Sequence, residues 1–198
     1  ITYMRTDSLN LSEVAISAAQ EEIISKYGKE FHQARRYKTS SSGAQEAHEA
    51  IRPTDLTKPT ILGLDEQSSK LYSLIYKRTL ASQMSDAQLQ KTKVTISISG
   101  RDEHFIADGE VLSFAGFLEV YDYMSSDDKL LPEISKSDIL TLVDMSSRES
   151  FSRAKPRYTE ASLVKEIEQM GIGRPSTFAT MITTVQDRNY VVKDTRSV

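Results

Sequence analysis

Hydrophobic residues near the start of the chain recur at three- and four-residue steps, which is the spacing of one face of an α-helix. This pattern predicts a helix over residues 11–27. Asn10 and Glu13 have the spacing of a capping box, and Gly28 suits the left-handed conformation that ends a helix. The predicted apolar face consists of Val14, Ile16, Ala18, Ala19, Ile23, Ile24 and Tyr27.

Two further helices are predicted before residue 90. Residues 45–51 can form a short helix that must end before Pro53, because a proline disfavours helical geometry at the residue before it, Arg52. Asp65 can cap a longer helix. The predicted inner face of that longer helix consists of Leu71, Leu74, Ile75 and Met84.

The hydrophobic period changes from helical to two after residue 90. Val94, Ile96 and Ile98 alternate with hydroxyl residues, as in a half-buried strand. Further strands are predicted at residues 105–107, 111–114, 118–121 and 139–143. The turns between them are predicted at Asp108-Gly109 and Ala115-Gly116. This pattern predicts an antiparallel β unit.

The last part of the chain returns to helical spacing. One short helix, running to Met170, is predicted to be capped by Thr159, and a second opens at Pro175-Ser176 after a glycine-rich break. The apolar stripe of the second helix consists of Phe178, Met181, Ile182 and Val185. A strand at residues 190–192 would follow it, which is the layout of a helix-turn-helix with a wing.

The predicted fold class is therefore mixed α and β, with several domains. A helical domain covers residues 1–90, a β-rich domain covers residues 91–155, and a helix-turn-helix-like segment covers residues 156–198. The first eight residues resemble the middle of a strand and contain no initiator methionine or signal peptide, so we expect the chain to be part of a longer protein.

The amino-acid composition excludes several classes of protein but does not reveal the function. The 25 Lys and Arg residues against 28 Asp and Glu give a net charge of −3, so charge alone does not predict a nucleic-acid partner. Cysteine is absent, which excludes a disulfide framework and a zinc finger in this stretch. No apolar run approaches the ~20 residues of a membrane span, and a cytoplasmic protein is expected.

Tyr3 and Arg5 form the first candidate site. In an extended segment they project from the same face, because side chains two residues apart do so. A cation beside a phenol favours the phenolate, and a guanidinium can bind two oxygens of a phosphodiester. The pair therefore suits attack of a tyrosine on a phosphate backbone. The alternative interpretation is an ordinary strand with an exposed tyrosine and arginine.

His48 and Arg52 form the second candidate site. On the predicted short helix they would share one face and could contact an anion. The His48-Glu49 pair begins a zinc-binding H-E-x-x-H pattern, but Arg52 replaces the second histidine and cannot ligate a metal. No residue of the chain is predicted to bind a metal. The alternative interpretation is a surface pair that stabilises a helix end.

The third candidate site is the glycine-rich turn before the last helix. Arg174, Ser176 and Thr177 add a cation and two hydroxyls to a helix N-terminus, which attracts phosphate. The alternative interpretation is that Ser176 only caps the helix and the glycines only fit the turn. Arg188 could contact a further backbone phosphate or could be a plain surface residue.

Four motifs follow one another in the order found in bacterial type IA DNA topoisomerases. They are ITYMRTDS (residues 1–8), EAHEAIRPT (46–54), ASLVKE (161–166) and GIGRPSTF (171–178) with Gln186-Asp187-Arg188. The chain resembles the central part of these enzymes essentially from end to end. The resemblance implies a tyrosine-bearing helical domain, a β-rich arch and a helical domain that lines a DNA groove.

The resemblance also implies roles for the candidate residues. Tyr3 would attack one DNA strand and become linked to its 5′ phosphate, Arg5 would hold the scissile phosphate, and His48 would support cleavage. Single-stranded DNA would be bound by Arg52, Arg174, Ser176, Thr177 and Arg188. After passage of the other strand and religation, negatively supercoiled DNA would be relaxed without ATP. The enzyme would act in the bacterial cytoplasm, associated with the nucleoid.

The resemblance places other parts of the machinery outside these residues. The family's Mg²⁺ site lies in a toprim domain, and its zinc ribbons or other DNA-binding repeats lie near the C-terminus. The segment alone is therefore expected to be inactive.

Two other functions remain open on sequence grounds. One is a non-catalytic winged-helix DNA-binding module, in which Tyr3 would be incidental. The other is a tyrosine recombinase, which places its tyrosine late in the catalytic domain. The early position of Tyr3, before the Arg and His residues, argues against the recombinase.

Overall fold

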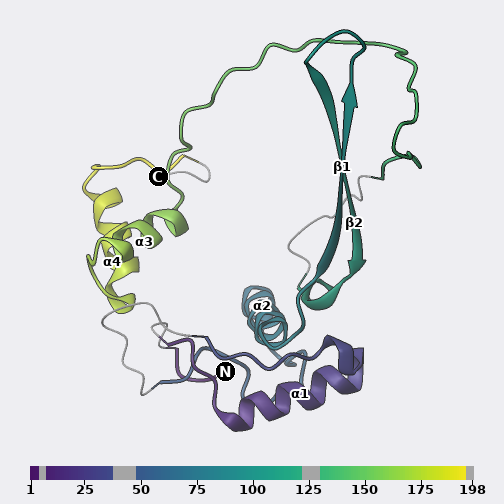
Figure 1. Ribbon diagram of the computed structural model, residues 1–198. Coiled ribbons are helices and arrows are strands. Elements are labelled where there is room, and N and C mark those ends of the chain that lie inside the picture. The colour runs from purple at the N-terminus through teal and green to yellow at the C-terminus, as the bar shows by residue number, and fades with distance from the viewer. Residues whose placement is uncertain (5–7, 38–47, 122–129, 195–198) are drawn as a thin grey trace. The chain divides into compact units, whose positions relative to one another are not determined.

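The computed structural model describes residues 1–4, 8–37, 48–121 and 130–194 (Figure 1). The chain divides into two compact units, residues 1–138 and residues 139–198. The division into three domains at residues 90 and 155 stays a prediction.

The first helix of the first unit, α1 (Glu13–Tyr27), has the predicted position. It ends at Gly28 with φ of 106°, as predicted, but its cap is Ser12 and not Asn10. The Ser12 side chain accepts a hydrogen bond from the amide of Ala15. Val14 was expected on the apolar face and is 78% exposed, because it lies about 200° around the helix from the buried Ile16.

A 3-10 turn, η1 (Lys29–Phe31), follows α1. The second helix is α2 (Glu66–Ser82), and Asp65 caps its N-terminus as predicted. The prediction of its inner face was wrong for Leu71 and Leu74, which are 56% and 51% exposed. The buried core residues of α2, Tyr76 and Leu80, lie in its C-terminal half, and Tyr72 packs against them from the preceding turn. The core consists of Ala19, Ile23, Leu56, Tyr76, Leu80, Met84 and Val120.

The β-rich part of the first unit is a single twisted hairpin (Figure 1). Strands β1 (Gln88–Ser97) and β2 (His104–Phe114) pair antiparallel, and the predicted alternation around Val94 and Ile96 is confirmed. The predicted turn at Asp108-Gly109 is wrong, because these residues lie inside β2 opposite Lys93 and Thr92. The chain reverses instead near Gly100, whose φ is 75°.

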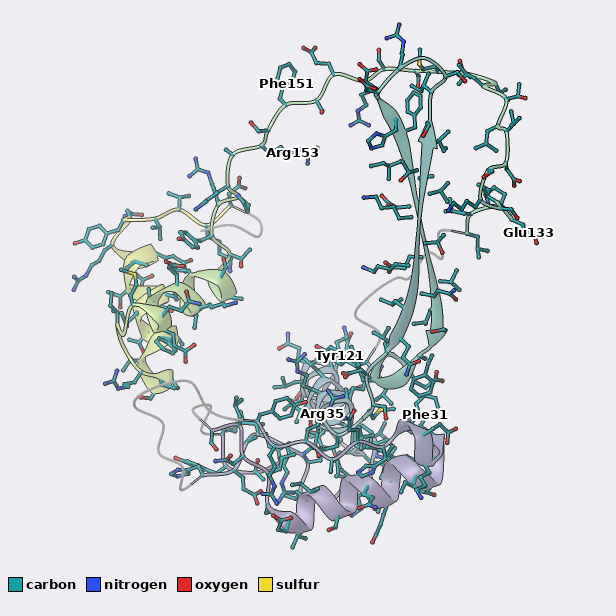
Figure 2. The ribbon with its side chains drawn as sticks, in the orientation of Figure 1. Phe31, Arg35, Tyr121, Glu133, Phe151 and Arg153 are labelled. Atoms are coloured by element: carbon teal, nitrogen blue, oxygen red, sulfur yellow. The ribbon has the colours of Figure 1, made fainter. Side chains whose placement is uncertain are left out.

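The base of the hairpin packs on the helical part of the first unit. The ring of Phe31, labelled in Figure 2, lies 4.7 Å from the ring of Phe114 between centroids. After β2 the chain turns at Gly116 into a second 3-10 helix, η2 (Gly116–Glu119), so the strand predicted at residues 118–121 is wrong. The amide of Phe117 donates to the carbonyl of Ser85, which ties the two ends of the hairpin together.

The second unit begins with an extended segment. Residues 139–143 form no strand, contrary to the prediction, because no described segment pairs with them. The side chains along this segment are exposed, including Phe151 at 79% (Figure 2). An apolar, β-prone pattern cannot form a strand without a partner that takes its backbone hydrogen bonds.

Two helices follow, α3 (Glu160–Gln169) and α4 (Pro175–Asp187). The predicted cap at Thr159 is confirmed, and Ile182 is buried on the predicted stripe of α4. The strand predicted at residues 190–192 is wrong: these residues bend, and the amides of Tyr190 and Val191 both donate to the carbonyl of Val185. The described residues of this unit therefore contain the two helices but no wing strand.

Candidate active site

The first unit brings Tyr3 and His48 together. Their ring centroids lie 5.9 Å apart with an angle of 34° between the ring planes. The Tyr3 side chain is 76% exposed, so a ligand can reach its hydroxyl from solvent. Arg5, the expected cation beside the tyrosine, lies outside the described residues. Two of the three candidate catalytic residues are thus neighbours although 45 positions separate their numbers.

The segment that carries Tyr3 is not a strand but is fixed through the preceding residue, Thr2. The Thr2 amide donates to the carbonyl of Arg52 at 2.9 Å. The Thr2 hydroxyl donates to the carbonyl of Ala50 at 2.8 Å and accepts from the amide of Arg52 at 3.0 Å. These three hydrogen bonds therefore hold the start of the chain alongside residues 50–52.

A short helix was predicted over residues 45–51. Residues 48–51 are not helical, so the prediction is wrong for them, and residues 45–47 lie outside the described part. Bonds between distant segments replace the helical ones, since the amide of Ala50 donates to the carbonyl of Asn10 at 2.8 Å. His48 and Arg52 consequently do not share a helix face. The loop instead serves as a platform for the segment that contains Tyr3.

Arg52 is held by its neighbours. Its Nε and Nη2 atoms donate to Oε2 of Glu49 at 2.7 and 2.6 Å, and Nη1 donates to the carbonyl of Pro53 at 2.9 Å. Three of the five guanidinium N–H groups are thus used, and two remain for another acceptor. Sequence reasoning did not assign a role to Glu49 or Thr2. The only signal available was their position inside the two motifs that contain His48 and Tyr3.

Glu49 also connects this loop to the start of α1. Burial acts to raise its pKa, but hydrogen bonds from Ser12 and Arg52 outweigh burial and lower the pKa below its usual value. A lowered pKa in the folded protein means that the ionised form is the one that stabilises the loop. This stabilisation is fully present above the carboxyl's ordinary pKa and is lost as the pH falls through the lowered value.

Acidification should therefore loosen the His48 loop. We expect the hydrogen-exchange protection of the amides of Ala50 and Arg52 to stay constant between about pH 5 and pH 7 and to fall below about pH 4. Glu49→Gln should remove this pH dependence and reduce protection at pH 7 by on the order of 1 kcal/mol. The matched control is Glu66→Gln, which removes a carboxylate from an exposed pair with Lys70. Unchanged pH dependence in Glu49→Gln would contradict the assignment.

His48 contains a polar atom without a hydrogen-bond partner. Its Nδ1 is buried and has no partner among the described residues. Leaving a buried polar atom unpaired costs about 1–3 kcal/mol, and such atoms call for an explanation, catalysis being one. The ring that carries this atom is the neighbour of the exposed Tyr3 ring.

The second unit carries the remaining predicted DNA contacts. Arg174 is the residue that precedes α4, and its Nη1 donates to the carbonyl of Gly173 at 2.7 Å. The Thr177 hydroxyl accepts from the amide of Arg174 at 2.9 Å and donates to its carbonyl at 3.0 Å, so Thr177 closes the helix start and Ser176 does not cap it. Arg174, Ser176 and Arg188 are exposed.

The described residues contain no cluster of metal ligands. Among them no group of three or more His, Asp or Glu side chains could hold a metal ion. The described helices also include none that is long and apolar enough to cross a membrane.

Comparison with known proteins identifies the family of the chain. The family model described as DNA topoisomerase matches residues 1–198. The chain is 43% identical to DNA topoisomerase 1 of Streptomyces coelicolor over 98% of its residues, and 43% identical to DNA topoisomerase 1 of Pseudomonas aeruginosa over 99%. It spans 22% and 23% of the lengths of these two relatives.

A solved structure agrees with the sequence comparisons. Full-length topoisomerase I from Thermotoga maritima matches 98% of this chain with a TM-score of 0.70 and 32% identity, and the match covers 32% of that protein. Family, relatives and structure thus agree with the four motifs. The chain belongs to the family of bacterial type IA DNA topoisomerases.

Proposed function

We propose that the full-length protein relaxes negatively supercoiled DNA by cutting one strand with Tyr3. The phenol oxygen attacks the phosphorus of a phosphodiester, an O–P bond to the tyrosine forms, and the bond to the deoxyribose 3′ oxygen breaks. The 5′ phosphate is then linked to the protein, the other strand passes, and the 3′ hydroxyl attacks the phosphotyrosine to restore the strand. The number of phosphoester bonds is unchanged at each step, so no ATP is needed.

The observation that carries this proposal is the exposed Tyr3 ring beside His48. A neutral phenol is a weak nucleophile, so its attack on a phosphodiester needs groups that stabilise the charge that develops on the phosphate. We assign Arg5, as a cation, and His48, as a hydrogen-bonding group, to this phosphate. The Nδ1 of His48, which is buried and has no hydrogen-bond partner among the described residues, supports a functional role for this ring.

We assign the contacts with single-stranded DNA to both units. Arg52 would use the two N–H groups that Glu49 and Pro53 leave free. In the second unit, Arg174, Ser176, Thr177 and Arg188 would contact the backbone near the start and the end of α4. Thr177 is already engaged in closing the helix start, so Ser176 is the more available hydroxyl.

A charge substitution tests the assignment of Arg174. In the full-length protein, Arg174→Ala should weaken binding of a single-stranded oligonucleotide by the same factor for different sequences. It should also reduce the slope of log affinity against log salt concentration by about 0.7, the value for one phosphate contact on a single strand. Arg101→Ala, an exposed arginine beyond β1, is the control. An unchanged slope in Arg174→Ala would exclude a phosphate contact.

The blocked DNA end tests the reaction itself. An oligonucleotide labelled at either end is incubated with the full-length protein and Mg²⁺, and the reaction is stopped with detergent. We expect protein linked to the fragment that begins with the new 5′ phosphate, and a free 3′ hydroxyl on the other fragment. Protein on a 3′ phosphate would point to a recombinase-like reaction. Absence of any adduct would favour the non-catalytic binding module.

The proposal also covers the metal ion, the roles of the domains and the place of action. The Mg²⁺ of the reaction would be bound outside the described residues, which offer no cluster for it, and the 198-residue segment alone should not relax DNA. The helical, β-rich and helix-turn-helix-like domains over residues 1–90, 91–155 and 156–198 would have the roles of nucleophile carrier, arch and DNA groove. The place of action would be the bacterial cytoplasm, with the enzyme on the nucleoid.

A further inference from the structure

We propose that Thr2 is a positioning residue that holds Tyr3 in register beside His48. This inference rests on the function proposed above and adds a residue to it. Three hydrogen bonds join Thr2 to the loop that follows His48. Two of them use the side-chain hydroxyl, once as a donor to the carbonyl of Ala50 and once as an acceptor from the amide of Arg52.

The Thr2 hydroxyl acts as both a donor and an acceptor, so a side chain at this position needs a hydroxyl to make both bonds. The single hydroxyl hydrogen of Thr2 is directed to the Ala50 carbonyl, and a lone pair receives the Arg52 amide. A side chain without oxygen would leave both of these backbone groups without their partner. A threonine next to a nucleophile could also be a mere exposed strand residue, but Thr2 is partly buried whereas Tyr3 is 76% exposed.

The loop that receives Thr2 is itself restrained at several points. The Ala50 amide is bound to the Asn10 carbonyl, two Arg52 nitrogens bind one oxygen of Glu49, and the Pro53 side chain is fully buried. Movement of this loop would therefore break contacts with the start of α1. Thr2 connects Tyr3 to a rigid support, as a positioning residue should.

The expected consequence concerns the chemical step more than DNA binding. Successive side chains of an extended segment point in opposite directions, so the Thr2 contacts leave the Tyr3 ring on the open side. Without the hydroxyl, the segment would sample other positions, and the Tyr3 oxygen would spend less time within reach of the phosphorus. A misplacement of about 1 Å can cost 10²-fold in rate. Of the residues assigned to DNA binding, Arg52 is bonded to Thr2 only through its backbone, and its guanidinium is held separately by Glu49 and Pro53, so DNA affinity should change little.

The experiment compares Thr2→Val and Thr2→Ser in the full-length protein. Valine keeps the branched shape without the oxygen, and serine keeps the oxygen without the methyl group. In single-turnover cleavage of a labelled oligonucleotide with Mg²⁺, we expect Thr2→Val to form the covalent adduct about 10–100-fold more slowly, with oligonucleotide Kd within about twofold of wild type. Thr2→Ser should recover to within about threefold.

A matched control separates positioning from general destabilisation. Thr57→Val removes a hydroxyl that donates to Asp55 at 2.6 Å on the exposed surface, and it should cleave at the wild-type rate. Melting temperatures are recorded for all variants. If Thr2→Val fails to fold, Thr2→Ser still tests the claim, because a variant that keeps the hydroxyl should cleave at nearly the normal rate.

Two results would overturn the inference. One is a Thr2→Val protein that cleaves as fast as wild type, and the other is a folded Thr2→Ser protein that is more than about 10-fold slower than wild type. Both leave the proposed function intact, because the wild-type adduct still forms. Absence of an adduct in the wild-type protein itself would instead reject the proposed function and the role of Thr2 with it.

Discussion

Tyr3→Phe in the full-length protein should lose covalent DNA capture by a factor of at least about 10³, because the substitution removes the protein atom that bonds to phosphorus in the proposed reaction. Binding of single-stranded DNA should persist, since it depends on residues elsewhere. The melting temperature should not change, because Tyr3 is 76% exposed and its hydroxyl supports no core contact. Adduct formation is measured after a detergent stop, and affinity is measured by fluorescence anisotropy.

Tyr190→Phe provides the matched control for this prediction. Tyr190 is 71% exposed in the second unit, and its loss of a hydroxyl is chemically the same. We expect it to retain wild-type capture. Normal capture by Tyr3→Phe would exclude Tyr3 as the nucleophile, and equal loss in both variants would show that the assay reports general damage.

Gly116→Ala should be the most damaging small substitution in the described part of the first unit. Gly116 has φ of 51°, and a Cβ there would lie 2.5 Å from the carbonyl oxygens of both Ser85 and Asp86. These are backbone atoms at the start of the hairpin, so they cannot rotate away as a flexible side chain would. The left-handed conformation and the overlap together should cost about 2–4 kcal/mol. Hydrogen exchange at the base of the hairpin measures this cost.

Gly63→Ala distinguishes the two contributions to that cost. Gly63 has φ of 81°, but no atom lies within 4 Å of the place where a Cβ would be. It should therefore show only the conformational penalty of roughly 1–2 kcal/mol. If Gly116→Ala proves no more destabilising than Gly63→Ala, the close approach of Gly116 to residues 85 and 86 is not a constraint in solution.

The helices were predictable because their signals are local. Gly28 and Asp65 terminate or cap helices through contacts within four residues, and both predictions are confirmed. The apolar stripe that contains Ile182 on α4 also follows from spacing alone. The prediction for α2 was wrong where burial depends on a partner: α1 and η2 pack on one part of its surface, and Leu71 lies outside that part and remains exposed.

The strands were less predictable because a strand needs a second segment. Asp108-Gly109 resembles a turn, yet pairing with β1 holds it extended inside β2. Residues 139–143 have the composition of a strand, but no described segment pairs with them. Local composition contains no information about either partner.

The candidate site was predictable through its residue types and not through its geometry. The predicted short helix carried His48 and Arg52, whereas the structure has a loop stabilised by Thr2 and Asn10 from the beginning of the chain. Tyr3 and His48 were singled out separately, and only the folded chain shows that they are neighbours. Glu49 was missed because its role depends on contacts with Ser12 and Arg52, which no spacing rule predicts.

The most direct test of the central claim is to identify the amino acid that is linked to DNA. The full-length protein is trapped on a single-stranded oligonucleotide with Mg²⁺, digested with a protease and a nuclease, and analysed by mass spectrometry. The proposed mechanism predicts a nucleotide attached through a 5′ phosphate to the peptide that contains Tyr3 and to its phenol oxygen. A nucleotide found on another residue, or a Tyr3 peptide that is always unmodified while DNA is captured, would contradict it.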